Sequence, residues 1–119
     1  MVSDERLIAI GISHHTASVE DRETLAVAPD VVPTLLGRLR DGGFSNEALL
    51  LSTCNRTELY TVPGRRGDVE RLARWLADTG GATDTAIGEL IYRKRDKDAL
   101  HHIFRVASSL DSLVLGEPQ

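Results

Sequence analysis

The chain has 119 residues, of which 41% are hydrophobic and 27% charged, with a formal net charge of -4 at pH 7. The length and the hydrophobic content suit one globular domain with a single core and exclude a disordered chain. The negative net charge excludes a protein that binds nucleic acid over its whole surface. The single cysteine excludes an intrachain disulfide.

Apolar runs and helix-capping residues predict the elements of the first half of the chain. Residues 7–12 form a nearly continuous apolar run, which is typical of a strand buried on both faces. Ser18 followed by Asp21 resembles a capping box, so we expect a short helix that Pro29 closes. A second helix is expected from Asp30 as its N-cap to the next pair of glycines, because its aliphatic residues repeat at helical spacing.

The second half of the chain continues the alternation. Residues 48–51 and 59–62 predict two strands, separated by a polar stretch. A third helix is expected from Asp68 to the next glycine pair, then a weaker strand over residues 87–93 and the longest helix from Asp96. The buried stripe of that last helix is expected to hold Ala99, Leu100, Ile103, Ala107 and Leu110.

The predicted order, β-α-α-β-β-α-β-α, indicates an α+β fold. Its helices can cover one face of a small mixed or antiparallel sheet, in a sandwich close to the ferredoxin-like arrangement. We expect a single domain over residues 1–119, without a Gly-x-Gly-x-x-Gly dinucleotide fingerprint. The sequence has neither a signal-peptide-like start nor an apolar stretch near the ~20 residues that cross a bilayer, so a cytoplasmic protein without membrane contact is expected.

The only cysteine, Cys54, follows the second predicted strand in a polar stretch. A lone cysteine beside a strand is more often an inert core residue than a catalyst. However, functional groups often emerge where a strand ends, and Arg56 could favour a thiolate. Thr53, Asn55 and Arg56 offer donors that suit a carboxylate-bearing substrate and an oxyanion. Cys54 is therefore the candidate nucleophile.

His102 is the candidate general acid or base. At about 100° per residue, it lies on the flank of the predicted apolar stripe, whereas His101 points away from it. A satisfied boundary histidine is an equally good interpretation. His14 and His15 end the first predicted strand, and the sequence leaves open which of them faces a site. The histidines and the cysteine lack ligand-like spacing, so no metal site is expected.

Two basic clusters interrupt the acidic chain, one within residues 65–74 and the other within residues 93–97. Each could be a local patch for an anionic partner. A solvated face is the simpler interpretation of both clusters.

Three motifs occur in order, at residues 11–17 (GISHHTA), 51–60 (LSTCNRTELY) and 106–119 (VASSLDSLVLGEPQ). Together they resemble the N-terminal catalytic domain of the glutamyl-tRNA reductase family. In that family a thiolate attacks the ester between glutamate and its tRNA. The glutamyl thioester is then reduced with NADPH to glutamate-1-semialdehyde, on the route to 5-aminolevulinate, haem and other tetrapyrroles.

The resemblance implies a role for each matching residue. Cys54 would be the nucleophile. His102 would correspond to a histidine of the family that precedes the third motif and affects activity. Arg56 would pair with the carboxylate of the glutamyl group, and Glu58 would bind its amino group. The further substrate contacts would be Thr53, Asn55, Ser112, Glu117, Pro118 and Gln119.

The resemblance also implies a cofactor and partners. NADPH would be bound by a domain missing from this chain, so the fragment would bind no cofactor and lack reductase activity. Glutamyl-tRNA(Glu) would be the substrate, the full-length protein would be a homodimer, and the next pathway enzyme, glutamate-1-semialdehyde aminomutase, could be a partner.

Two other functions stay open at this point. One is a regulatory module that binds haem or a protein partner, with Cys54, His14 and His15 as candidate iron ligands. No haem-attachment spacing supports it. The other is a merely structural domain, which predicts that Cys54 is buried and reacts slowly with iodoacetamide.

Overall fold

The computed structural model describes residues 6–79 and 85–115. Its strands pair into one antiparallel sheet in the order β2-β3-β1-β4. The strands are β1 (Ile8–Ser13), β2 (Ser45–Ser52), β3 (Arg56–Pro63) and β4 (Tyr92–Arg95). The helices are α1 (Val19–Leu25), α2 (Val32–Asp41), α3 (Val69–Thr79), α4 (Thr85–Leu90) and α5 (Asp96–Leu115).

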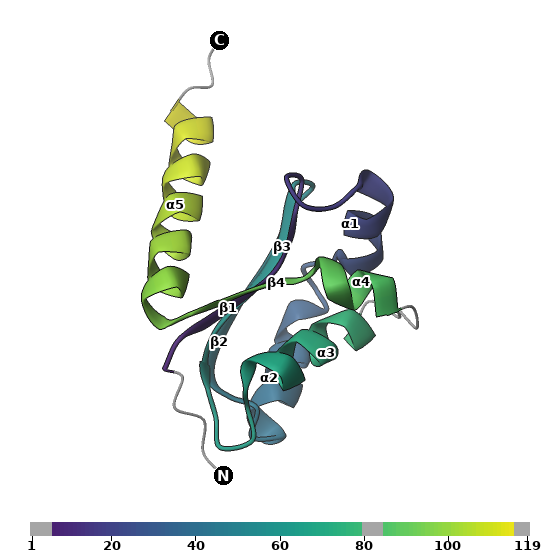
Figure 1. Ribbon diagram of the computed structural model, residues 1–119, viewed down its shortest axis with the longest axis vertical. Coiled ribbons are helices and arrows are strands. Elements are labelled where there is room, and N and C mark those ends of the chain that lie inside the picture. Colours follow the sequence, from purple (N-terminus) through teal and green to yellow (C-terminus); the bar gives the residue numbers. More distant parts are fainter. Residues whose placement is uncertain (1–5, 80–84, 116–119) are drawn as a thin grey trace.

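Helices lie on both faces of the sheet. Helices α1 to α4 lie on one face and α5 lies on the other (Figure 1). Strand β3 separates β1 from β2, and β1 separates β3 from β4, which is the split arrangement of ferredoxin-like folds. The α+β prediction is therefore confirmed. The predicted arrangement described helices on one face of the sheet only; in the structure α5 follows β4 onto the opposite face.

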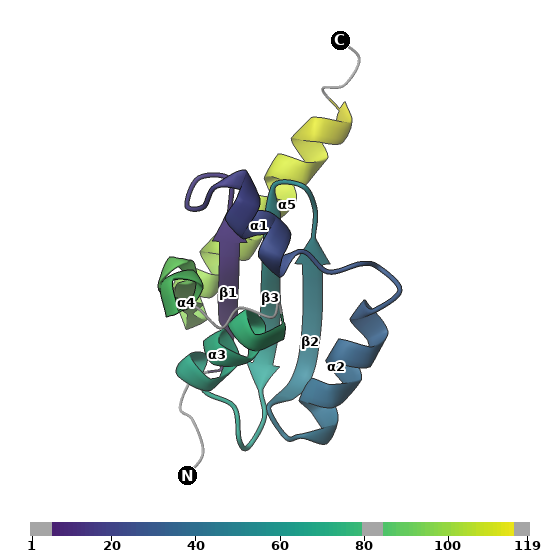
Figure 2. The same cartoon turned by 90° about the vertical axis from the view of Figure 1, so that its right-hand side faces the viewer.

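The main core lies between the sheet and helices α1 to α4, which Figure 2 shows in front of the strands. Alternate residues of β1 point into it, namely Ile8, Ile10 and Ile12. The other residues of β1 face α5, and all of them are buried too. This explains the continuous apolar run, because both faces of this inner strand are covered. Across the described residues, no helix is long and apolar enough to cross a membrane.

Helix α1 begins as the sequence predicts, whereas α2 does not. The Ser18 hydroxyl oxygen accepts a hydrogen bond from the backbone N–H of Asp21 at 3.2 Å, as an N-cap should. In α2 the N-cap is Val31, without a side-chain hydrogen bond, and Pro33 lies in the first turn. The prediction of Asp30 as the cap was wrong by one residue.

Residues 87–93, expected as a strand, fall partly in α4 and partly in β4, with Ile91 between the two elements. Ile87 and Ile91 are both buried, and they lie four residues apart. Residues four apart share one face of a helix and also one face of a strand, so the spacing does not distinguish the two. The strand itself begins at Tyr92 and pairs with β1.

The buried stripe of α5 also differs from the prediction. Ala99, His102 and Val106 are buried, whereas Leu100 is 45% and Leu110 37% exposed. The buried side of the helix is thus rotated by roughly 60–75°, less than one residue at about 100° per residue, from the arrangement that the apolar residues alone predict. The reason is the burial of His102, a polar residue that finds its partner on the sheet.

Candidate active site

Cys54 lies exposed in the turn between β2 and β3. The Thr53 hydroxyl shapes this turn by accepting hydrogen bonds from the backbone N–H groups of Asn55 (3.1 Å) and Arg56 (3.2 Å). The backbone N–H of Thr53 donates to the carbonyl of Arg56 at 2.8 Å. The exposure of Cys54 contradicts the interpretation of this cysteine as a buried core residue.

Two neighbouring segments hold the turn from outside. The backbone N–H of His14 donates to the carbonyl of Asn55 at 2.8 Å. Arg22 of α1 donates from Nε to the carbonyl of Cys54 at 3.3 Å and from Nη1 to the carbonyl of Ala17 at 2.8 Å. The backbone that carries the thiol is therefore fixed by these two segments and by the hydrogen bonds within the turn itself, which is a requirement for a positioned reactive group.

Glu58 is the centre of a buried charged network. Its side chain is 0% exposed. The carboxylate accepts hydrogen bonds at Oε1 from Arg56 Nη1 (3.1 Å) and the Tyr60 hydroxyl (2.6 Å). At Oε2 it accepts from the Tyr92 hydroxyl (2.5 Å) and forms an ion pair with His102 Nε2. Such complete pairing is needed, because an unpaired buried carboxylate costs several kcal/mol.

A glycine in β1 lets this network form. Gly11 pairs with Glu58 of β3 on one side and with Tyr92 of β4 on the other. Since glycine has no side chain, the side chains of Glu58 and Tyr92 meet across β1. A Cβ on Gly11 would lie 2.2 Å from the carbonyl oxygen of Thr57 and 2.8 Å from Cγ of Glu58.

Gly11→Ala is therefore expected to lower the free energy of unfolding by about 1–3 kcal/mol, because the added methyl must displace backbone atoms of β3. Urea unfolding measures this change. Gly37→Ala is the matched control, since a Cβ at Gly37 meets nothing within 4 Å and alanine favours the helix. Equal stability of Gly11→Ala and the native chain would contradict this packing.

The network sets the protonation of its members. Burial alone would raise the pKa of Glu58, but hydrogen bonds from His102, Tyr60 and Tyr92 and the charge of His102 lower it from 4.5 to about 2. Burial and then the Glu58 carboxylate raise the pKa of both tyrosines far above 10.0. Because Glu58 is ionised at neutral pH, His102 Nε2 carries the hydrogen, and Nδ1 is the ring nitrogen that Glu58 does not use.

A cavity of about 310 Å³ lies beside this network, between the sheet and α5. Its lining contains several basic side chains and no aspartate or glutamate among the described residues, so it suits an anionic ligand. The lining residues are Ser13, His15, Thr16, Arg56, Tyr92, Lys94, His102, Arg105, Val106 and Ser109.

The structure brings two of the predicted site residues, Arg56 and His102, together in the lining of this cavity. Cys54 lies in the turn that leads into Arg56. Glu58 is hydrogen-bonded to both Arg56 and His102, and each of its carboxylate oxygens is already engaged by protein side chains. In this arrangement neither oxygen faces an open position for a substrate amino group.

The remaining predicted contacts fall outside what the structure describes. Glu117, Pro118 and Gln119 lie beyond the described residues, and the side chain of Ser112 is likewise not described.

The sequence interpretation missed several residues, namely Arg22, Tyr60, Tyr92 and Arg105, and it placed Lys94 only in a basic cluster, not at this site. For the first of the two tyrosines a signal was present, because Tyr60 follows Glu58 by two residues and must share its face of β3. The others reach the site through the pairing of β4 with β1 and the packing of α1 and α5, which lie far from Cys54 in sequence.

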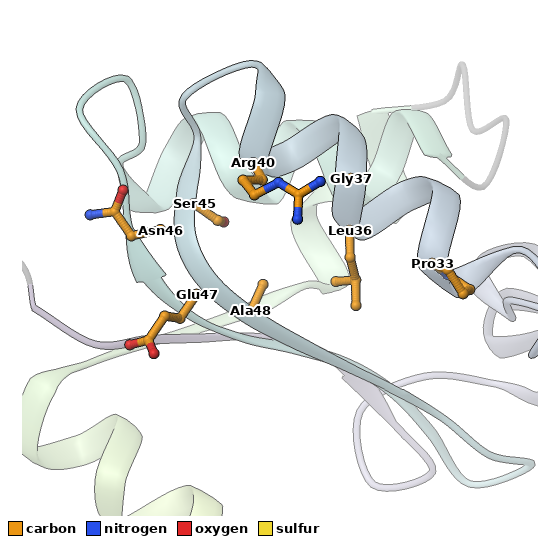
Figure 3. A pocket seen from close by; sticks show the side chains of 8 residues that line it. All are labelled: Pro33, Leu36, Gly37, Arg40, Ser45, Asn46, Glu47 and Ala48. Carbon is orange, nitrogen blue, oxygen red and sulfur yellow. The ribbon is translucent and has the colours of Figure 1, made fainter.

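Two other hollows on the surface lack the combination of histidines and basic residues that lines the basic cavity. One, of about 250 Å³, lies between α2 and the edge strand β2, where Leu36 and Ala48 point into it and Glu47 points away (Figure 3). The other lies beside Arg66 and Trp75, in the basic cluster of residues 65–74. In that cluster Arg71 pairs with Asp68 at 3.6 Å and Arg66 lies over the ring of Phe44. Unlike the basic cavity, neither hollow is lined by a histidine.

The fold and the site thus define an antiparallel α+β domain with an exposed thiol two residues before Arg56, which lines a basic cavity. The family model of the glutamyl-tRNA(Glu) reductase N-terminal domain matches residues 10–119. The chain belongs to the glutamyl-tRNA reductase family and corresponds to its N-terminal domain.

Individual relatives agree with this assignment. The chain is 43% identical over 113 residues to glutamyl-tRNA reductase of Shewanella piezotolerans, covering 95% of the chain and 26% of the relative. It is 40% identical over 114 residues to the enzyme of Hydrogenovibrio crunogenus, covering 96% and 26%. The solved glutamyl-tRNA reductase from Methanopyrus kandleri matches with a TM-score of 0.67 and 31% identity, over 95% of this chain and 25% of that one. The chain therefore spans about a quarter of the length of these relatives.

Proposed function

We propose that Cys54 accepts the glutamyl group of glutamyl-tRNA as a thioester, the first half of a reductase reaction. The observation that carries this proposal is an exposed thiol in a fixed turn next to Arg56, whose side chain lines a basic cavity. The relatives supply the substrate, because their name specifies glutamyl-tRNA.

In the proposed step the Cys54 thiolate attacks the carbonyl carbon of the ester. A carbon–sulfur bond forms, the carbon–oxygen bond to the terminal ribose breaks, and the leaving ribose oxygen takes up a proton. The Thr53 hydroxyl oxygen already accepts two hydrogen bonds, so its own hydrogen is left to donate to the oxyanion that forms in between. The Asn55 amide is a second donor.

Arg56 and His102 are the proposed groups on the cavity side. The Arg56 guanidinium pairs with the side-chain carboxylate of the glutamyl group, using the nitrogens that Glu58 does not engage. His102 presents Nδ1 for proton transfer. Glu58 is better suited to hold these two side chains than to bind the substrate amino group, because its oxygens are occupied and buried.

Reduction of the thioester needs a hydride donor, which the family resemblance gives as NADPH. The described part of the chain does not fit a dinucleotide, because its sheet is antiparallel throughout and lacks the parallel β-α-β unit of nucleotide-binding folds. We therefore propose no reduction step here. The chain is expected to form the thioester and hydrolyse it slowly, without producing glutamate-1-semialdehyde.

The test is cleavage of glutamyl-tRNA by this chain without NADPH, compared with cleavage of glutaminyl-tRNA. The glutamyl ester should be cleaved about 10–100 times faster, because a charge-assisted hydrogen bond to Arg56 is worth about 1.5–3 kcal/mol. Rates that match spontaneous hydrolysis, or equal rates for the two substrates, would overturn the proposal.

No contact among the described residues favours the alternative of a haem-binding module. The rings of His14 and His15 lie 3.9 Å apart. The backbone of His14 holds the Cys54 turn, and His15 lines the basic cavity. Both histidines are thus part of the candidate active site.

A further inference from the structure

The basic cavity holds more positive charge than one glutamyl carboxylate requires. Arg56 is already paired with Glu58, at 3.1 Å and with only 12% of its side chain exposed. Lys94 and Arg105 line the same cavity, and among the described residues neither forms an ion pair with a carboxylate. Within the part of the chain that the structure describes, two cations are therefore left without a matching negative charge beside the Arg56–Glu58 pair.

The fold turns these two cations towards the cavity. Successive residues of β4 face opposite sides of the sheet. Tyr92 and Lys94 face α5, whereas Arg93 faces the other side and pairs with Glu70 of α3 at 2.9 Å. The basic cluster of residues 93–97 is therefore not one uniform solvated face.

The second cation, Arg105, belongs to helix α5 and lies on the face of that helix that lines the cavity. Arg105 follows His102 by three residues and precedes Ser109 by four, so all three side chains share one face of the helix. The Lys94 ammonium lies 6.0 Å from the centre of the Tyr92 ring, whose hydroxyl is bound by Glu58. Lys94 thus lies over a ring that the buried network fixes.

We propose that Lys94 and Arg105 form a second oxyanion subsite, beside Arg56, that binds a phosphate or carboxylate group of the acylated substrate. This proposal rests on the proposed function. A terminal phosphate of the tRNA and a carboxylate of the glutamyl group present the same chemistry to an ammonium and a guanidinium. The two sources differ in whether a small glutamyl ester, which has no phosphate, also uses the subsite.

Direct binding tests the subsite without any catalysis. Inorganic phosphate and glutarate are titrated into the chain and followed by NMR. The Lys94→Gln/Arg105→Gln double variant should bind at least one of these anions about tenfold more weakly. The charge-matched control is Lys97→Gln/Arg38→Gln, whose exposed side chains lie outside the cavity lining. Thermal unfolding of both double variants establishes that each is folded.

Acylation kinetics then identify the source of the anion. If KM rises for glutamyl-tRNA but not for a small glutamyl ester, the subsite binds phosphate. If KM rises for both substrates, it binds the carboxylate. The subsite would be overturned if the Lys94→Gln/Arg105→Gln variant bound phosphate and glutarate as tightly as the control variant does and had the same KM values for both substrates. Failure of the native chain to acylate Cys54 would overturn the proposed function instead, while the NMR titration would still decide the subsite.

Discussion

Replacing Glu58 with glutamine is expected to lower the free energy of unfolding by about 3 kcal/mol at neutral pH. The reason is the loss of the only negative charge in a buried network. Arg56 and His102 would remain beside a neutral amide, and breaking a buried ion pair by removing one partner costs about 3–5 kcal/mol. The amide also brings an N–H₂ group to a position where the four neighbouring side chains all donate.

The pH dependence provides a second measure of the same effect. The pKa of Glu58 is about 2 in the folded chain, against an ordinary value of 4.5. A lowered pKa stabilises the fold above the unfolded value, so this contribution is complete above about pH 4.5 and is lost as the pH falls through about 2. Urea unfolding between about pH 7 and pH 2 should show this loss in the native chain.

In Glu58→Gln this part of the pH dependence should be missing. Glu47→Gln is the matched control, because Glu47 is exposed on the edge strand, and this variant should follow the native curve within about 0.5 kcal/mol. If the difference between Glu58→Gln and the native chain were the same at every pH, the lowered pKa of Glu58 would be contradicted.

Cys54→Ser is expected to slow cleavage of glutamyl-tRNA by at least about 10³-fold, because a serine hydroxyl is a far weaker nucleophile than a thiolate without a dedicated base. The side chain is exposed, so stability should change by less than about 0.5 kcal/mol. The measurement is the single-turnover rate of ester cleavage, with urea unfolding as the control for folding.

Prior treatment of the native chain with iodoacetamide should have the same effect on cleavage as Cys54→Ser, and should leave the residual rate of that variant unchanged. Cleavage by Cys54→Ser at the native rate would show that the thiol is not the acyl acceptor. Cleavage would then have to be assigned to water activated elsewhere in the cavity.

The fold could be predicted as far as local patterns determine it. The apolar run of β1 and the alternation of helices and strands indicated the α+β class, and the polar turn after β2 indicated Cys54 as the candidate nucleophile. The α4–β4 region could not be assigned, because the spacing of Ile87 and Ile91 fits a helix and a short strand equally well.

The buried network lay beyond sequence reasoning for a different reason. A glutamate in a strand is ordinarily expected to be exposed. Glu58 is buried because Gly11 leaves room across β1, and because Tyr92 and His102 arrive from elements more than thirty residues away. The same long-range pair rotates α5, so the apolar residues alone could not predict which face of that helix is buried.

The most direct test of the account is to detect the glutamyl group on the protein itself. The native chain is mixed with glutamyl-tRNA in the absence of NADPH, quenched in acid within one turnover, digested, and mapped by mass spectrometry. We predict a glutamyl adduct on the peptide that carries Cys54, removed by hydroxylamine as a thioester should be and absent from Cys54→Ser. Ester cleavage without an adduct, or an adduct on any other residue, would contradict the assignment of Cys54 as the acyl acceptor.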